Sequence, residues 1–282
     1  RGGGIWIVPA RGGTSKQIAA GGSRPAWSPD GSHIAFQSDE HADAAPFGSA
    51  AQNGSTIQLI AADGGAGSSV THNGNPTGGH ATPRWRPDGR FICFTVSDSG
   101  PSNGLWLLDR KIGAVRILYH RDEVYEAVFA PDGSSIYIAG GDALITRLPF
   151  DAASGTVTGS AEVMPVPGVP GVGGLSISRD GARLAFAGLG LSSQIWAQRV
   201  RADGSPAGEP RALTSGTSRR NSVPVISPDG TKVAYMSSRQ GERPNLWMMD
   251  IDGRHPLQLT SDHEFESQPE WSSDRSGILY LA

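Results

Sequence analysis

The chain has 282 residues, among them 39 glycines, 20 prolines and a single cysteine, and its formal net charge at neutral pH is −3. This charge balance offers no basic surface for nucleic acid or anionic lipid. Cys93 has no partner for a disulfide within the chain, and no stretch reaches the roughly 18 continuous apolar residues of a membrane span. We therefore expect no nucleic-acid partner and no transmembrane segment.

The first two expected elements are hairpins. The earlier one, at 5–19, precedes any repeated motif and supplies two strands without an inner pair beside them. The later one, at 25–36, has two apolar runs around the turn Ser28-Pro29-Asp30-Gly31. Proline suits the first central position of a tight turn, aspartate can bond its own backbone, and glycine accepts a positive φ. The segment therefore predicts a β-hairpin.

This hairpin recurs five times along the chain. The turn aspartates follow one another at 58, 44, 48, 49 and 45 residues, and they are Asp30, Asp88, Asp132, Asp180, Asp229 and Asp274. A period in the mid-forties, with short strands and no helical pattern, is typical of a four-stranded propeller blade. The longer first interval predicts an insertion in the first blade.

We expect one all-β domain over 1–282, a six-bladed β-propeller. Apolar-Trp pairs mark the third strand of most blades, and Asp-Gly or Gly-Gly turns lead to the fourth. The blades are predicted at 25–71, 83–119, 126–164, 174–214, 223–260, and 268–282 together with 5–19. The last blade takes its inner pair from the C-terminus and its outer pair from the N-terminus, which closes the ring and removes free sheet edges.

A polar ring is predicted at one mouth of the central channel. Propellers concentrate function on the face with the loops that enter each inner strand, where side chains of different blades converge. The predicted ligand-binding residues on this face are Arg24, His80, Tyr125, Glu126, Asn221 and Glu266, with Arg220 adding positive charge. Their mixed charge would suit a polar ligand, a peptide carboxylate or a cation.

The first-blade insertion offers the weak metal candidates Asp39, Glu40, His41 and Asp43. Carboxylate oxygens and one imidazole nitrogen could hold a divalent cation. A solvated polar loop is the other interpretation, and no other cofactor is expected. We also expect no peptidase nucleophile elbow in this chain, and the sequence has no phosphate-binding loop and no His-Glu-x-x-His motif. No catalytic residue is therefore assigned.

The repeats resemble those of the TolB-type, WD-repeat-like β-propeller family, in which Pro-x-Trp-Ser-Pro-Asp-Gly is followed by Ile-Ala-Phe, Ile-Trp, Asp-Gly-Gly and Leu-Thr. The match is close at 25–36, 224–235 and 245–260, whereas 177–181 lacks the turn proline and 272–277 lacks the proline and shifts the glycine. The resemblance covers essentially the whole chain. It implies a periplasmic or otherwise extracytoplasmic scaffold that binds partner proteins, and we expect a monomer.

Similar repeats also occur in the propellers of prolyl-oligopeptidase-type peptidases, in sensor regions of bacterial regulators and in some polysaccharide lyases. The sequence thus predicts a non-enzymatic binding or sensor module that presents a polar channel mouth to a protein, peptide, carbohydrate or other small polar ligand. Two alternatives stay open: a metal-assisted polysaccharide lyase or hydrolase with its site in the channel mouth, and the propeller part of a larger peptidase or regulator.

Overall fold

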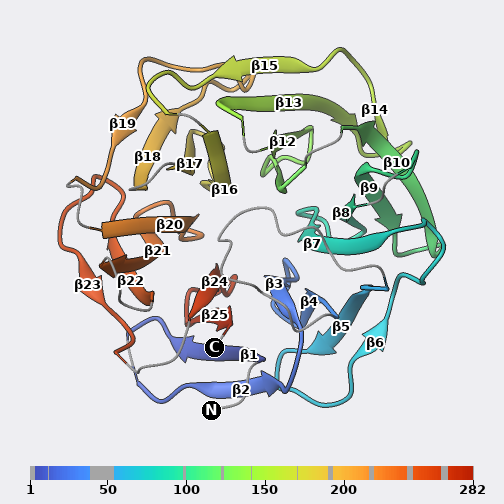
Figure 1. Ribbon diagram of the computed structural model, residues 1–282, viewed down its shortest axis with the longest axis horizontal. Coiled ribbons are helices and arrows are strands. Elements are labelled where there is room, and N and C mark those ends of the chain that lie inside the picture. Colours follow the sequence, from blue (N-terminus) through green and yellow to red (C-terminus); the bar gives the residue numbers. More distant parts are fainter. Residues whose placement is uncertain are drawn as a thin grey trace.

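The computed structural model describes residues 4–11, 13–38, 54–97, 100–121, 124–140, 142–169, 171–189, 193–215, 219–239, 244–261 and 266–281. Within these ranges, 25 strands form six antiparallel sheets around a central axis (Figure 1). The predicted all-β, six-bladed propeller is confirmed. No helix in the described ranges is long and apolar enough to cross a membrane.

The first three blades each begin with an inner strand beside the axis. From the axis outward, the first blade consists of β3 (Ser23–Trp27), β4 (His33–Gln37), β5 (Ile57–Ala61) and β6 (Ser68–Ser69). The second consists of β7 (Gly79–Trp85), β8 (Phe91–Ser97), β9 (Gly104–Asp109) and β10 (Ala114–His120). The third consists of β11 (Glu126–Phe129), β12 (Ser135–Ala139) and β13 (Leu144–Asp151), the last of which pairs with both β14 (Thr156–Val157) and β15 (Glu162–Pro165).

The other three blades have four strands each. The fourth consists of β16 (Gly171–Ile177), β17 (Arg183–Leu189), β18 (Gln194–Arg199) and β19 (Arg211–Ala212). The fifth consists of β20 (Arg219–Ile226), β21 (Lys232–Arg239), β22 (Asn245–Asp250) and β23 (Leu257–Gln258). The sixth consists of β24 (Ser267–Trp271), β25 (Gly277–Leu281), β1 (Ile5–Pro9) and β2 (Lys16–Ala19).

The sixth blade joins the two ends of the chain. Strand β1 pairs antiparallel with β25 in an unbroken register from Ile5 opposite Leu281 to Pro9 opposite Gly277. Figure 1 places both termini at this blade. The inner strands β24 and β3 contact each other, so the ring is closed. The predicted closure by strands from both termini is confirmed.

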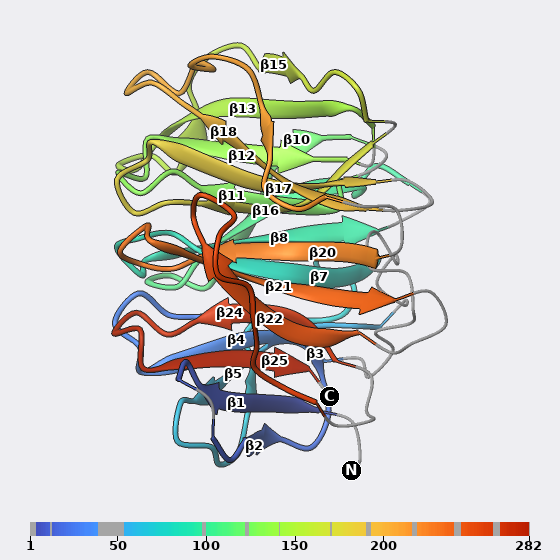
Figure 2. The same ribbon diagram turned by 90° about the vertical axis from the view of Figure 1, so that its left-hand side faces the viewer.

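In every inner hairpin the turn aspartate accepts a backbone N–H bond from the residue two positions later, and in four of the six it also accepts a hydroxyl bond from the serine two positions earlier. In the first blade, the Asp30 carboxylate accepts hydrogen bonds from the Ser28 hydroxyl (2.5 Å) and the Ser32 backbone N–H (3.0 Å). These bonds lower the pKa of Asp30 to about 2, and Gly31 supplies the positive φ of 72°. We call the face that carries these turns the turn face; in Figure 2 it lies on the left, where β20 points.

Indole groups connect neighbouring blades. The Nε1–H of Trp85 donates to the carbonyl oxygen of Ala26, and that of Trp271 donates to the carbonyl oxygen of Val225, both at 3.1 Å. Each bond runs from the end of one inner strand to the preceding inner strand. Trp27 holds the same repeat position, but its buried Nε1 has no acceptor among the described residues. Two of these three seams are therefore locked by an indole hydrogen bond.

Candidate functional site: the central channel

The channel contains a cavity of about 210 Å³ in the half nearer the turn face. It is bounded by the last residues of all six inner strands and by two turn prolines, Pro29 and Pro228. The inner strands surround the axis in the order β3, β7, β11, β16, β20 and β24 (Figure 1). Side chains from blades far apart in sequence thus meet around one cavity.

Two charged side chains line this cavity, Arg84 and Glu270. They stand at the next-to-last position of their inner strands, where the other blades have Ala26, Val128, Ser176 and Val225. The charges of the cavity therefore come from the second and sixth blades, which flank the first.

Glu126 holds Arg84 in place. Its Oε1 atom pairs with Arg84 Nη2 at 2.5 Å, and its Oε2 atom accepts the backbone N–H of Leu175 at 3.1 Å. The carboxylate thus bridges the second, third and fourth blades. Burial opposes the positive charge of Arg84, but Glu126 and Glu270 outweigh it and raise the pKa of the guanidinium.

Glu270 is the less compensated of the two cavity charges. Its carboxyl makes no hydrogen bond or close ion pair with another described residue. Burial raises its pKa to about 7, repulsion from Glu126 adds to the rise, and attraction to Arg84 opposes it. The channel therefore holds a carboxyl that changes charge near neutral pH.

A backbone bulge explains why Glu126 takes this role. Five inner strands carry a bulge with positive φ three residues before their last residue, at Arg24, Thr82, Gly174, Val223 and Gln268. The equivalent residue of β11 is Glu126, which instead pairs regularly opposite Ala139. In a regular strand, side chains two residues apart point to the same side. Because β11 has no bulge, the Glu126 side chain points to the same side as that of Val128, toward the channel.

Three of the predicted ring residues, His80, Asn221 and Glu266, are buried at or just before the start of inner strands. Each is bonded to a threonine that follows the outer strand of the preceding blade. The bonds join His80 Nδ1 and Thr71 Oγ1 (2.8 Å), Asn221 Nδ2 and Thr214 Oγ1 (3.4 Å), and Thr260 Oγ1 and Glu266 Oε2. These side chains therefore lie in the seams between blades.

The same three threonines also bind the third strand of their own blade. Their Oγ1 atoms accept the backbone N–H groups of Ile57 (2.8 Å), Ile195 (2.9 Å) and Leu246 (2.9 Å). His80 additionally bonds the carbonyl oxygen of Pro76 through Nε2 at 3.0 Å, and burial lowers the pKa of its imidazole. Each hydroxyl thus connects two blades.

The other three predicted residues, Arg24, Tyr125 and Arg220, belong to three different blades. Arg24 is half-buried, and its backbone N–H donates to the side-chain oxygen of Gln268. Tyr125 is half-buried next to β11, and Arg220 is exposed on β20. None of the seven predicted residues lines the 210 Å³ cavity, although Glu126 contacts Arg84, which does. Arg84 and Glu270 were not among the predicted site residues. They could have been found from the sequence, because each is charged at a repeat position where the other blades have uncharged residues.

The metal candidates Asp39, Glu40, His41 and Asp43 lie outside the described residues. Within the described ranges, no group of three or more His, Cys, Asp and Glu side chains is placed to hold a metal ion.

One segment bears on the expectation that this chain has no nucleophile elbow. Residues 100–104 read Gly-Pro-Ser-Asn-Gly and so match the Gly-x-Ser-x-Gly pattern. A nucleophile elbow lies between a strand and a helix. In this chain the segment connects β8 to β9, and the Ser102 Oγ atom bonds Thr77 Oγ1 at 2.7 Å. The pattern is present, but its structural context is that of a turn between two strands.

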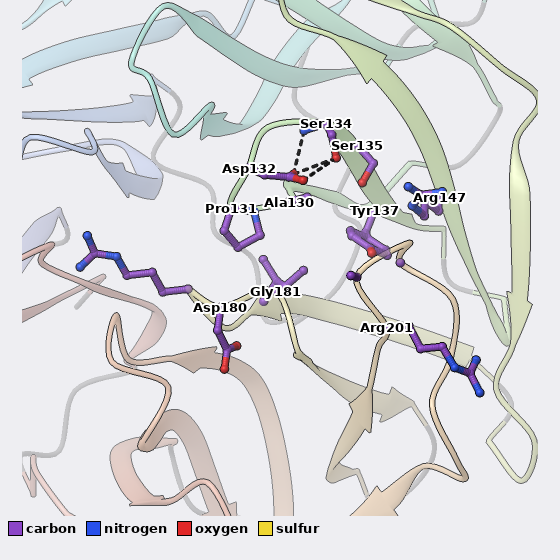
Figure 3. Close-up of a pocket in the computed structure, with 14 residues that line it drawn as sticks. Ala130, Pro131, Asp132, Ser134, Ser135, Tyr137, Arg147, Asp180, Gly181 and Arg201 are labelled. Carbon is purple, nitrogen blue, oxygen red and sulfur yellow. Dashed lines mark hydrogen bonds between the residues drawn. The ribbon is translucent and has the colours of Figure 1, made fainter.

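A second cavity, of about 410 Å³, lies between the third and fourth blades on the turn face (Figure 3). Its charged side chains are largely engaged elsewhere: Asp132 accepts hydrogen bonds from Ser134, and Arg147 pairs with Glu162 at 3.1 Å. Figure 3 shows Arg201 directed away from Tyr137. This cleft is lined by more charged side chains than the channel cavity, but both of its aspartates are bonded within their own turns.

Comparisons with known proteins support the fold. No protein-family model matches the chain. The uncharacterized peptidase YuxL of Bacillus subtilis is 34% identical over 88 residues, which are 31% of this chain and 12% of the peptidase. The match thus spans a small part of that relative.

Solved propellers match nearly the whole chain. TolB from Acinetobacter baumannii superimposes with a TM-score of 0.71 at 23% identity, covering 96% of this chain and 66% of that one. A TolB-like protein from Agrobacterium tumefaciens gives 0.74 at 19% identity, with 99% and 97% covered. The propeller domain of the trilobed protease from Pyrococcus furiosus, which has an open velcro topology, gives 0.58 at 14% identity, with 93% and 94% covered. These likenesses establish a TolB-like propeller fold.

Proposed function

We propose that this chain is a non-enzymatic binding or sensor module of the TolB type, which accepts a polar group of a protein, peptide or small ligand into its central channel. The observation that carries the proposal is Glu270, a charged side chain that lines the channel cavity without a close partner among the described residues. Glu270 is partly buried, and a carboxylate partly removed from water is stabilised by an opposite charge, so a ligand that supplies this partner gains binding energy. The TolB-like fold supports placing this role outside the cytoplasm.

The test is a binding screen with two matched variants. Purified protein is screened against a peptide library and an oligosaccharide array. Val128 lines the channel, so Val128→Phe narrows it, whereas Val163→Phe makes the same change on the exposed outer strand β15. We expect ligands of the wild type to lose at least tenfold in affinity with Val128→Phe and to keep it with Val163→Phe. Recovery of no ligand, or equal binding by both variants, would refute the proposal; the thermal melt of each variant confirms folding.

A second candidate is the propeller part of a larger peptidase. The 88-residue match to YuxL favours it. If it is correct, the natural protein should have an intact mass well above 29.4 kDa and should react with a fluorophosphonate serine-hydrolase probe. A natural chain of this mass without labelling would exclude it.

A further inference from the structure

The charges of the channel do not balance. Arg84 and Glu126 form an ion pair at 2.5 Å and neutralise each other. The carboxyl of Glu270 then has no opposite charge of its own. The equivalent positions of the other inner strands hold Ala26, Val128, Ser176 and Val225, none of which is charged. When Glu270 is ionised, the channel carries one uncompensated negative charge in a space where burying such a charge is costly. One positive unit restores neutrality.

The shape and walls of the cavity indicate what kind of cation fits. A volume of about 210 Å³ exceeds the roughly 150 Å³ in which a protein cavity binds benzene. Between Glu270 and the turn face, the wall is apolar and includes Phe129, Ile226 and the partly exposed Trp27. An unbranched aliphatic stem would pack against this wall while its charged head reached the carboxyl.

Other ligand classes fit the lining less well. A hard divalent cation needs about six oxygen ligands, and the lining offers side-chain oxygens from Glu270 and Ser176 alone. The Ser176 hydroxyl already accepts the backbone N–H of Ile226 at 2.6 Å. A carboxylate ligand would need Arg84, which is already paired with Glu126.

We propose that the channel receives a primary ammonium group at the end of an unbranched aliphatic chain, as on a lysine side chain, with Glu270 as its counter-ion and the apolar wall packing its stem. This inference rests on the proposed function of the channel and names its ligand class. Binding exchanges one cation for another, because the ammonium pairs with the ionised carboxyl and displaces its proton. The chemistry is non-covalent throughout.

This exchange makes binding depend on pH. With the pKa of Glu270 at about 7, the ionised fraction rises about tenfold between pH 6 and pH 8, while an alkylammonium, with a pKa near that of lysine at about 10.4, stays charged. The affinity for the ammonium should therefore rise about tenfold over this range. Arg84 and Glu126 are the other charged groups that face Glu270, and the raised pKa of Arg84 keeps its guanidinium charged over this range.

The experiment uses the full chain and four probes: n-butylammonium chloride, n-butanol, sodium butyrate and the capped peptide Ala-Lys-Ala. Dissociation constants are measured by ligand-observed NMR at pH 6 and pH 8. We expect n-butylammonium to bind at least tenfold more tightly than n-butanol or butyrate at pH 8. Comparable binding of the peptide would identify a lysine side chain as a ligand, and binding of n-butylammonium alone would restrict the site to small free amines.

Two glutamine variants complete the test. Glu270→Gln should lose at least tenfold in n-butylammonium affinity at pH 8 and lose the pH dependence, whereas Glu209→Gln, on an exposed loop, should change neither. Thermal melts at pH 6 confirm that both are folded. Tighter binding of butyrate or n-butanol, or unchanged binding by Glu270→Gln, would overturn the inference. Channel ligands without an ammonium group, recovered in the library screen, would overturn it while leaving the proposed function intact.

Discussion

At the scale of single residues, Glu270 couples the stability of the propeller to pH. Its pKa in the folded chain, about 7, lies above the ordinary value of 4.5. The folded state therefore binds the proton more tightly, so the stabilisation is complete below about pH 4.5 and is lost as the pH rises through 7. Alkaline conditions thus leave an unfavourable charge in the channel.

Glu270→Gln should remove this pH dependence, because glutamine does not ionise. We expect the variant to be more stable than the wild type at pH 8.5 by about 1 to 3 kcal/mol and to show no such gain at pH 5. Urea unfolding at the two pH values measures the difference, and Glu209→Gln serves as control. An equal effect at both pH values would show that the carboxyl does not titrate in this range.

At the scale of elements, the contributions of the indole hydrogen bonds between blades to stability can be compared. Trp85 and Trp271 donate to the preceding inner strand, whereas the buried Nε1 of Trp27 has no acceptor in the described part of the chain. Replacement by phenylalanine removes the donor at all three sites with the same loss of volume. The three sites share one repeat position, but they differ in the indole hydrogen bond and in burial, because Trp27 is partly exposed whereas Trp85 and Trp271 are buried.

We expect Trp→Phe to cost about 1 kcal/mol more at Trp85 and at Trp271 than at Trp27, the net value of a typical hydrogen bond. Full truncation of the buried Trp271 to alanine should cost about 3 to 5 kcal/mol. Chemical denaturation of the purified variants measures both losses in the free energy of unfolding. Equal costs at the three phenylalanine sites would show that the indole bonds add nothing to the packing, and a loss below about 1 kcal/mol for Trp271→Ala would contradict its burial.

The hairpins were predictable because their turns are encoded locally. Aspartate occupies a fixed place in all six turns, proline and glycine do so in most of them, and the Asp30 carboxylate makes the bonds that such a turn requires. The seam positions of His80, Asn221 and Glu266 were not predictable by counting from the turn. A bulge at Thr82, Val223 or Gln268 inserts one residue and reverses which face the preceding side chains occupy. Arg84 and Glu270 follow their bulges, so comparing repeat positions would have found them.

At the scale of the whole molecule, closure depends on β1 and β2. The unbroken register of β1 with β25 covers the edge that β25 would otherwise expose. Ile5 and Ile18 are buried in a cluster that also contains Leu279 and Ile34 of the neighbouring blade. Both ends of the chain thus support one seam.

Deletion of residues 1–20 should therefore remove half of the closing blade. We expect a lower melting temperature, a loss of cooperativity and concentration-dependent aggregation through β25. Calorimetry measures the first two, and light scattering measures the third. Deletion of residues 1–4, which leaves β1 intact, is the control and should have little effect. A cooperative melt at an unchanged temperature after the longer deletion would refute the dependence on closure.

The threonines at the blade seams have a consequence for how the repeats diverged. Each of Thr71, Thr214 and Thr260 meets a different partner: an imidazole, an amide and a carboxylate. A hydroxyl can rotate to donate or to accept, so it is compatible with all three. The threonine thus accepts partners of different chemistry, and the partner residue in the next blade can be replaced without a compensating change of the threonine. Such a joint lets duplicated blades drift apart in sequence while the ring stays closed.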